Sequence, residues 1–269
     1  MTPPYGHLTM SIIHNELFVF NPDTSRLEIR DRATLKTKSS LTVSNFYSIA
    51  GKSFCKENKY IYVSTTRKTI LKFDSDGDIV AKWSTGDIKG RPSLTADCNV
   101  AFIPHDGTTR ILIFTPYGDL FRIIQLKMNI GGARLNCAVQ LPNGNFVVSY
   151  GTDQDKQHGV SLTDSKGNVL RSFGGIKGEG TNRVNGVYDM IADESGNVYA
   201  VDHNNHRILR LNSDLEYVNE FVSAESGLRF LHGAIFDEMH GRLFVMGSTW
   251  DDTISNLSPG KIFVYETQG

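Results

Sequence analysis

The densest group of potentially reactive side chains in the sequence is Asp-His-Asn-Asn-His-Arg at residues 202–207. Imidazole, carboxylate and guanidinium groups this close together suit metal ligation, acid–base catalysis, or hydrogen bonding within a tight loop. Short alternating apolar runs at 198–201 and 208–211 flank the group, so it lies in a loop between two predicted strands. The elements that position this loop decide between the three roles.

These elements repeat along the chain. Short runs of period-two alternation recur throughout, separated by turns rich in Gly, Asn and Asp, which is typical of an all-β protein. Three turns share the pattern D/T-x-x-G-D/N, which suits a tight hairpin, at residues 74–78, 115–119 and 164–168. Counterparts of the strand at 198–201 start roughly 40 to 50 residues apart, at 17–20, 60–63, 100–103, 146–149 and 243–246.

This period is that of a four-stranded propeller blade. We therefore predict a single all-β domain over residues 1–269, a six-bladed β-propeller with four-stranded antiparallel blades at about 8–45, 46–90, 91–133, 134–182, 183–229 and 230–269. In the fifth blade we expect strands at 190–193, 198–201, 207–212 and 217–221. The last blade shows only three predicted strands, so it either stays three-stranded or is completed by residues before Leu8.

Residues 178–212 resemble the NHL repeat. A D-x-x-N-H-R-I stretch carries the resemblance, after a Gly-rich lead-in, at Asp202, Asn205, His206, Arg207 and Ile208. The closing segment 241–266 also resembles the last repeat of NHL domains that end tripartite-motif proteins. The resemblance implies an NHL-type propeller from a longer ubiquitin-ligase chain, with any ligase activity outside these residues. It also implies that the Asn and Arg of the stretch organise the turn, which leaves His203, Asn204 and His206 available for binding.

Catalytic sites known on propellers are not favoured by the sequence. A cation held by oxygen ligands of the inner strands would need several carboxylates, but the corresponding positions are Thr9, Ser53, Ser93, Asn136, Asp189 and Gly233. Four histidines fall in loops between second and third strands, on three different repeats and without short ligand spacing: His105, His158, His203 and His206. No G-x-S-x-G motif is present. We predict no catalytic residue, no metal, no cofactor and no small-molecule substrate.

Basic side chains suggest a binding surface instead. An arginine stands just before four of the predicted inner strands, which would place these arginines around one rim of the propeller. Arginine suits phosphate, and planar groups nearby could stack on unpaired bases. The predicted RNA-binding set is Arg91, Arg110, Arg134, Lys177, Arg183, Arg229, Arg67, Lys68, His203 and His206. Acidic residues in the same loops weaken the field, and solvated loop charges without a ligand are the alternative interpretation.

Composition agrees with a globular protein. The chain has 269 residues, is 39% hydrophobic and carries a formal net charge of -1, so any nucleic-acid binding requires a local basic patch. No apolar run approaches the roughly 18 residues of a membrane span, and residues 1–7 lack the features of a signal peptide. Cys55, Cys98 and Cys137 have no metal-site spacing, and we expect reduced thiols. We predict a cytoplasmic protein with no membrane partner.

The expected function is a non-catalytic binding module that recognises single-stranded RNA through a basic loop face. The alternative is a protein-interaction platform that recruits substrates or scaffolds for a ubiquitin ligase. That alternative would use apolar side chains on the same face, namely Trp250, Phe230 and Tyr47.

Overall fold

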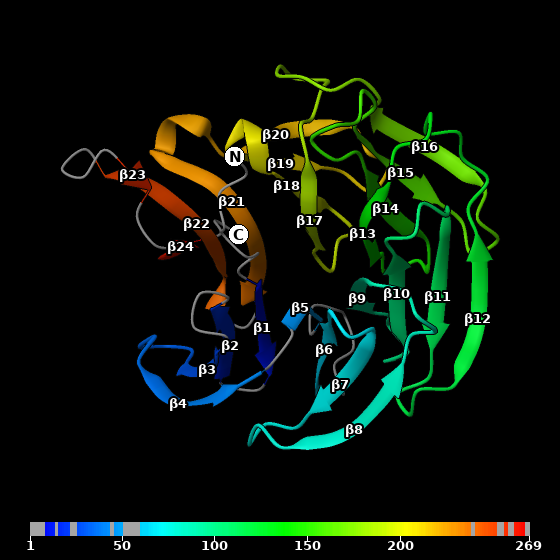
Figure 1. Ribbon diagram of the computed structural model, residues 1–269. Helices are drawn as coiled ribbons and strands as arrows, with labels where there is room; N and C mark the ends of the chain where they lie inside the picture. Colours follow the sequence, from blue (N-terminus) through cyan, green and yellow to red (C-terminus); the bar gives the residue numbers. More distant parts are fainter. Residues whose placement is uncertain are drawn as a thin grey trace.

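The computed structural model describes residues 9–13, 16–21, 26–43, 46–50, 60–237, 240–251, 256–257 and 261–266. Within them, six four-stranded antiparallel sheets surround a common centre (Figure 1). The predicted all-β, six-bladed propeller is confirmed. No helix of the described residues is long and apolar enough to cross a membrane.

In the first five blades the strands follow the chain from the centre of the ring to its rim. The first three blades contain β1 (Thr9–Ile13), β2 (Glu16–Asn21), β3 (Arg26–Asp31) and β4 (Thr37–Thr42); β5 (Phe46–Ala50), β6 (Ile61–Thr65), β7 (Thr69–Phe73) and β8 (Ile79–Ser84); and β9 (Gly90–Leu94), β10 (Val100–Pro104), β11 (Arg110–Phe114) and β12 (Leu120–Gln125). The next two contain β13 (Leu135–Gln140), β14 (Phe146–Tyr150), β15 (Gly159–Thr163) and β16 (Val169–Gly174); and β17 (Val187–Ala192), β18 (Val198–Asp202), β19 (Arg207–Leu211) and β20 (Tyr217–Val222). Short 3-10 helices are η1 (His203–Asn205) and η2 (Ala224–Ser226).

The sixth blade is built differently. It contains β21 (Leu228–Asp237), β22 (Arg242–Asp251), the two-residue β23 (Asn256–Leu257) and β24 (Lys261–Glu266). Both β23 and β24 pair with β22, and within the described residues no strand lies outside β24. Completion of this blade by residues before Leu8 falls outside the described part of the chain.

The ring closes through its inner strands. Each of β1, β5, β9, β13 and β17 contacts the inner strand of the next blade, and β21 contacts β1. Buried apolar side chains fill the spaces between neighbouring blades; Phe244 of the last blade, for example, shares a cluster with Leu17 of the first. Residues from the same end of different inner strands therefore lie near each other although they are far apart in sequence. We call the end formed by the segments 85–89, 105–109, 126–134, 151–158, 175–186 and 203–206 the loop face.

The predicted tight turns lie at the opposite end, and hydrogen bonds close them. In the turn 164–168, Gly167 N–H donates to the Asp164 carbonyl, and Asn168 N–H donates to the Asp164 carboxylate at 2.9 Å. Gly167 has φ +79°, and its carbonyl accepts from Lys127 N–H of the preceding blade. A β-carbon at Gly167 would collide with the Gln125 carbonyl, so this turn also sets how closely two blades approach.

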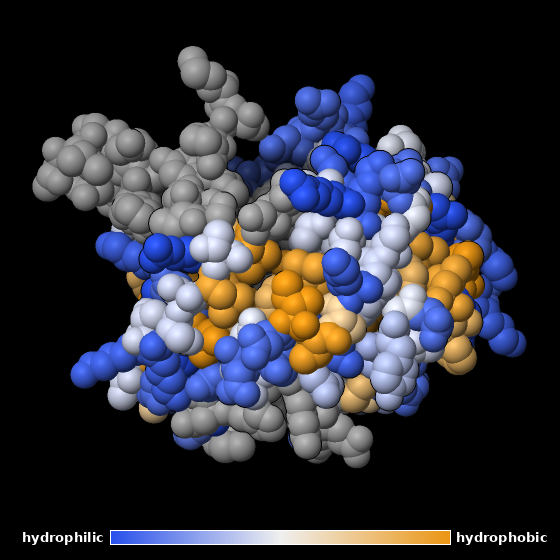
Figure 2. All heavy atoms as spheres, turned by 60° about the horizontal axis from the view of Figure 1, so that its bottom comes forward, coloured by the Kyte–Doolittle hydropathy of each residue, from blue (hydrophilic) through white to orange (hydrophobic). Residues whose placement is uncertain are grey.

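Most of the exposed large apolar side chains in the described residues lie on outer strands, whereas Ile176 lies on the loop face. Those of β8 and β12 are Ile79, Val80, Leu120, Phe121 and Ile123. Figure 2 shows this flank of the molecule, where apolar surface lies between charged side chains.

The cysteines differ from the expectation of reduced thiols. Cys98 is disulfide-bonded, and Cys55 lies outside the described residues. Cys137 is free and buried in β13, where its sulfur lies 3.1 Å from Ser149 Oγ. The expectation is therefore wrong for Cys98 and holds for Cys137.

Candidate functional site

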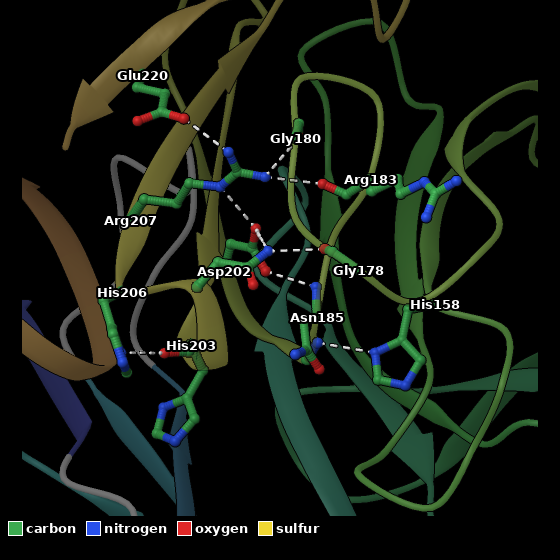
Figure 3. Close-up of polar contacts among 12 residues, drawn as sticks. His158, Gly178, Gly180, Arg183, Asn185, Asp202, His203, His206, Arg207 and Glu220 are labelled. Carbon is green, nitrogen blue, oxygen red and sulfur yellow. Dashed lines mark hydrogen bonds and ion pairs between the residues drawn. The ribbon is translucent and has the colours of Figure 1, made fainter. Parts of the chain in front are cut away.

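Arg207 lies at the centre of a hydrogen-bonded network that includes Asp202 and Asn205 of the polar segment 202–207 (Figure 3). Its Nε donates to Asp202 Oδ2 at 2.9 Å and its Nη1 to Glu220 at 2.6 Å. Its Nη2 donates to the carbonyls of Gly180 and Arg183, at 2.8 and 2.9 Å. The guanidinium thus binds the loop 175–186, which connects the fourth and fifth blades.

Asp202 and Asn205 complete this network. Asp202 is fully buried at the end of β18, where its Oδ1 accepts from Asn185 N–H and its Oδ2 accepts from Asn205 Nδ2. The same Asn205 amide donates to the Gly178 carbonyl at 2.9 Å. These contacts confirm the structural interpretation of Asp202, Asn205 and Arg207, and they extend it from one turn to a loop between blades.

Burial and hydrogen bonding act against each other in this network. Burial raises the pKa of the Asp202 carboxyl, and its donors offset only part of that cost. Burial also opposes the charge of Arg207, but the hydrogen bonds and charges of Asp202 and Glu220 raise the pKa of its guanidinium. The arginine therefore stays charged, and its ion pair keeps a buried carboxylate in place.

Five side chains with planar rings gather at the loop face, and we call them the ring cluster. His203 lies 5.2 Å from Tyr188, 5.5 Å from Phe230 and 5.1 Å from His232 between ring centroids. His206 contacts Phe230 edge-on at 4.8 Å. His232 is buried, whereas the other four rings are half-buried. The buried His232 packs beneath rings that are partly accessible to solvent. Accessible ring surfaces of this kind suit stacking of a planar ligand.

The backbone of the ring cluster is strained at two positions. His206 has φ +57° and Phe230 has φ +46°, a region that side chains other than glycine rarely adopt. Phe230 N–H donates to His206 Nδ1 at 3.1 Å, and His203 Nδ1 donates to the Leu231 carbonyl at 2.7 Å. These bonds hold the strained conformation, and strain of this kind is concentrated at functional sites.

Asp153 anchors one side of the ring cluster. Its Oδ1 accepts from the Tyr188 hydroxyl and from Asn204 Nδ2, both at 2.9 Å. Although burial opposes its charge, these bonds and the nearby Lys177 hold the pKa of Asp153 below its ordinary value. The carboxylate belongs to the fourth blade and its donors to the fifth, so it fixes the orientation of Tyr188 from a neighbouring repeat.

Arg91 reaches the ring cluster from the third blade. Its Nη1 donates to the Tyr188 carbonyl, and its guanidinium carbon lies 5.9 Å from the Tyr188 ring centroid. Burial, followed by the charge of Arg91, lowers the pKa of His105 to about 4. Burial, His203 and Arg91 together lower the pKa of His232 to about 3. These imidazoles are therefore neutral at pH 7.

The predicted RNA-binding set is only partly available for binding. Besides Arg91 and the two histidines, Lys68 pairs with Asp87, Arg110 pairs with Asp106, and Lys177 donates to the Asp153 carbonyl. Arg67, Arg134 and Arg183 are exposed, and their guanidinium groups make no contact with a described acceptor.

Two of the four predicted rim arginines lie inside inner strands rather than before them. Arg91 is the second residue of β9, and Arg229 is the second residue of β21. Arg229 is half-buried and donates to the Leu228 carbonyl at 2.9 Å. The prediction placed these two wrongly because the inner strands begin earlier than the apolar alternation indicates. Phe230 joins the ring cluster, whereas the side chains of Tyr47 and Trp250 lie outside the described part of the structure.

Hydrogen bonds to the backbone also hold the other two loop histidines, His105 and His158. His105 Nε2 donates to the Asn136 carbonyl at 3.0 Å. His158 is buried; its Nδ1 accepts from Gly186 N–H, and its Nε2 donates to the Thr152 carbonyl at 2.9 Å. Of the four, only His203 and His206 share the ring cluster. Among the residues that the structure describes, no group of three or more His, Cys, Asp or Glu side chains is arranged to hold a metal ion.

Inner-strand polar residues contribute to the packing of the ring. Asn136 is buried, and its Nδ2 donates to the Gly151 carbonyl at 2.8 Å. Asp189 Oδ2 accepts from Ala234 N–H of the next blade at 3.1 Å. Asn136 and Asp189 are two of the inner-strand residues at the positions where a cation would need oxygen ligands, and both side chains bond to backbone groups.

Sequence reasoning missed two rings of the cluster, Tyr188 and His232. Ring closure brings them together from two blades, a contact that local spacing does not encode. One signal was present, because Arg91 and Tyr188 are each the second residue of an inner strand. Aligning the repeats on their inner strands would have placed these two side chains at the same end of the ring. Asn204 was expected to be available for binding, but its amide donates to Asp153.

Comparisons with known proteins identify the fold. No protein-family model and no curated protein matches the sequence. Among solved structures, a hydrazine synthase from Kuenenia stuttgartiensis has a TM-score of 0.64 at 12% identity, covering 99% of this chain and 97% of that chain. Virginiamycin B lyase from Staphylococcus aureus has a TM-score of 0.61 at 12% identity, covering 99% and 86%. The β-propeller domain of Cps50 (Swd1) from Myceliophteria thermophila has a TM-score of 0.58 at 12% identity, covering 96% and 86%. Two of these proteins are enzymes by name, so the shared propeller does not decide between catalysis and binding.

Proposed function

We propose that this propeller is a non-catalytic binding module of the NHL type that holds single-stranded RNA on its loop face. The ring cluster carries the proposal. Its half-buried Tyr188, His203, Phe230 and His206 offer ring faces that suit unpaired bases, since stacking accepts any base. In the tripartite-motif setting implied by the NHL resemblance, such a module would supply recognition for a ligase located elsewhere.

Arginines of the loop face and of the adjoining strand β21 support an anionic ligand. Arg183 is exposed on the loop that Arg207 holds, and Arg134 is exposed on the preceding loop between blades. Arg229 adjoins Phe230 in β21. Each guanidinium could make charge-assisted hydrogen bonds to a phosphate, whereas the apolar flank on β8 and β12 lies on the outer strands.

Fluorescence anisotropy with a short uridine-rich single strand tests this function. Replacing Arg134, Arg183 and Arg229 together by glutamine should remove up to three phosphate contacts, each about 1.5 to 3 kcal/mol when well formed. The matched control replaces Arg122, Arg171 and Lys166, which are exposed on outer strands or at the opposite end of the ring, so the change in net charge is equal. We expect the first variant to bind much more weakly and the control to bind like wild type. Absence of wild-type binding at micromolar concentration in low salt, or equal loss in both variants, would refute RNA binding and favour the protein-interaction platform.

A further inference from the structure

Arg91 differs in position from the other arginines of the loop face. It is half-buried in the inner strand β9, and its Nη1 donates to the Tyr188 carbonyl in β17, two blades away. The inner strand of the blade between them is β13. The side chain therefore extends across the ring of inner strands rather than outward along a loop.

The guanidinium of Arg91 retains unused donors. Within the described residues, its Nε and Nη2 make no hydrogen bond and no carboxylate forms an ion pair with it. The carbonyl of Tyr188 accepts from one edge of the guanidinium, and the Tyr188 ring centroid lies 5.9 Å from the guanidinium carbon. An arginine held in this way presents a fixed pair of donors that matches two oxygens of a phosphate.

Two imidazoles adjoin the Tyr188 ring that Arg91 contacts: the His203 ring lies 5.2 Å from Tyr188 and 5.1 Å from His232 between centroids. The charge of Arg91 is among the causes that lower the pKa values of His105, His203 and His232, with burial the main cause in each case. Asp106 pairs with Arg110, whereas Asp153 stays a carboxylate that accepts from the neutral donors of Tyr188 and Asn204. Within the described residues neither carboxylate forms an ion pair with Arg91, so no bonded anion neutralises its guanidinium.

We infer that Arg91, with His203 and His232, forms a binding site for a phosphate monoester. In an RNA ligand this group is the terminal phosphate, a step that rests on the proposed function. An internal phosphodiester would require the chain to leave on both sides of Arg91, whereas a terminal phosphate needs one exit. A monoester also carries about -1.5 to -2 charges at pH 7, more than one diester group.

The test uses a decauridine with a 5′-phosphate, a 3′-phosphate, or hydroxyl groups at both ends, each labelled on an internal base. We expect one of the two phosphorylated strands to bind wild-type protein about tenfold more tightly, or better, than the hydroxyl-ended strand. The identity of that strand shows which end enters the site. Equal affinity of all three strands would overturn the inference while leaving RNA binding intact.

Variants assign the preference to Arg91. The Arg91→Gln variant should lose the advantage of the phosphorylated strand, and Arg91→Lys, which keeps the charge but not the paired donors, should recover only part of it. The control Arg171→Gln removes an exposed arginine of β16 and should keep the full preference. Circular dichroism checks that each variant folds. If Arg91→Gln does not fold, the affinities of the three decauridines for wild-type protein decide whether a terminal phosphate is recognised.

A separate titration distinguishes this site from RNA binding. If no RNA strand binds, isothermal titration of wild-type protein with uridine monophosphate and with inorganic phosphate tests the site alone. Binding that Arg91→Lys weakens would support the phosphate site while the proposed RNA function fails. Absence of binding to both probes would overturn the inference as well.

Discussion

Arg207 Nε lies 2.9 Å from Asp202 Oδ2, and both side chains are almost completely buried, with 7% and 0% of their surfaces exposed. The pair joins the ends of β18 and β19 within one blade. Because Arg207 also donates to the carbonyls of Gly180 and Arg183, the same guanidinium fixes the segment that precedes β17. The charge of Arg207 therefore has a structural role: it positions the segment from which the inner strand β17 begins.

We expect Arg207→Gln to destabilise the protein by about 3 to 5 kcal/mol, because it leaves the buried Asp202 carboxylate without its cation. Arg183→Gln is the matched control, since Arg183 contributes its carbonyl to the network and its guanidinium is exposed. Urea unfolding measures both variants. A loss below about 1 kcal/mol for Arg207→Gln would show that the network contributes little to stability.

Gly167→Ala should cost more than a substitution at an otherwise similar turn glycine. Both Gly167 and Gly144 have positive φ, +79° and +84°. A β-carbon at Gly144 meets nothing within 4 Å, whereas one at Gly167 collides with the Gln125 carbonyl of the neighbouring blade. We expect about 1 to 3 kcal/mol for the backbone strain alone at Gly144 and a larger loss at Gly167. Equal losses in thermal or urea unfolding would contradict tight packing between these blades.

The loop-face histidines predict a loss of stability on mild acidification. Folding lowers the pKa of His105 to about 4 and of His232 to about 3, and it lowers the pKa values of His158, His203 and His206 as well. Below the ordinary histidine value of about 6.5, the unfolded chain binds protons that the folded protein does not, so the free energy of unfolding falls with pH. The loss continues down to about pH 4 for His105 and about pH 3 for His232.

Urea unfolding between pH 7.5 and 4.5 measures this effect. Each whole pKa unit corresponds to about 1.4 kcal/mol, so we expect a total loss on the order of a few kcal/mol. Carboxylates with lowered pKa values lose their contribution only below about pH 4, because their unfolded value is near 3.9. The variant His105→Leu should show a shallower dependence on pH; an unchanged slope would mean that His105 is not the neutral buried group described here.

The sequence predicted those features that depend on neighbouring residues. Turns with the D/T-x-x-G-D/N pattern and the network of Asp202 with Arg207 are both set within a few positions, and both were identified. The start of an inner strand depends on contacts between blades, which is why Arg91 and Arg229 were expected before their strands rather than inside them. Tyr188 and His232 join one cluster only because the ring closes, so local periodicity gave no sign of their proximity.

If the propeller binds RNA, the arginine contacts to phosphate and the stacking on the ring cluster should depend differently on salt. Each phosphate neutralised on a single strand contributes about -0.7 to the slope of log affinity against log salt, so removing Arg134, Arg183 and Arg229 should reduce the slope by about 2. Phe230→Leu keeps an apolar side chain in the ring cluster but removes a stacking face, which is typically worth about 1 to 3 kcal/mol per base. It should weaken binding by the same factor at low and high salt and leave the slope unchanged. Anisotropy titrations at several salt concentrations measure both quantities. Suppose that Phe230→Leu binds RNA like wild type, while the triple arginine variant shows a reduced slope of log affinity against log salt. The RNA then contacts the arginines alone, and the ring cluster has no part in recognition.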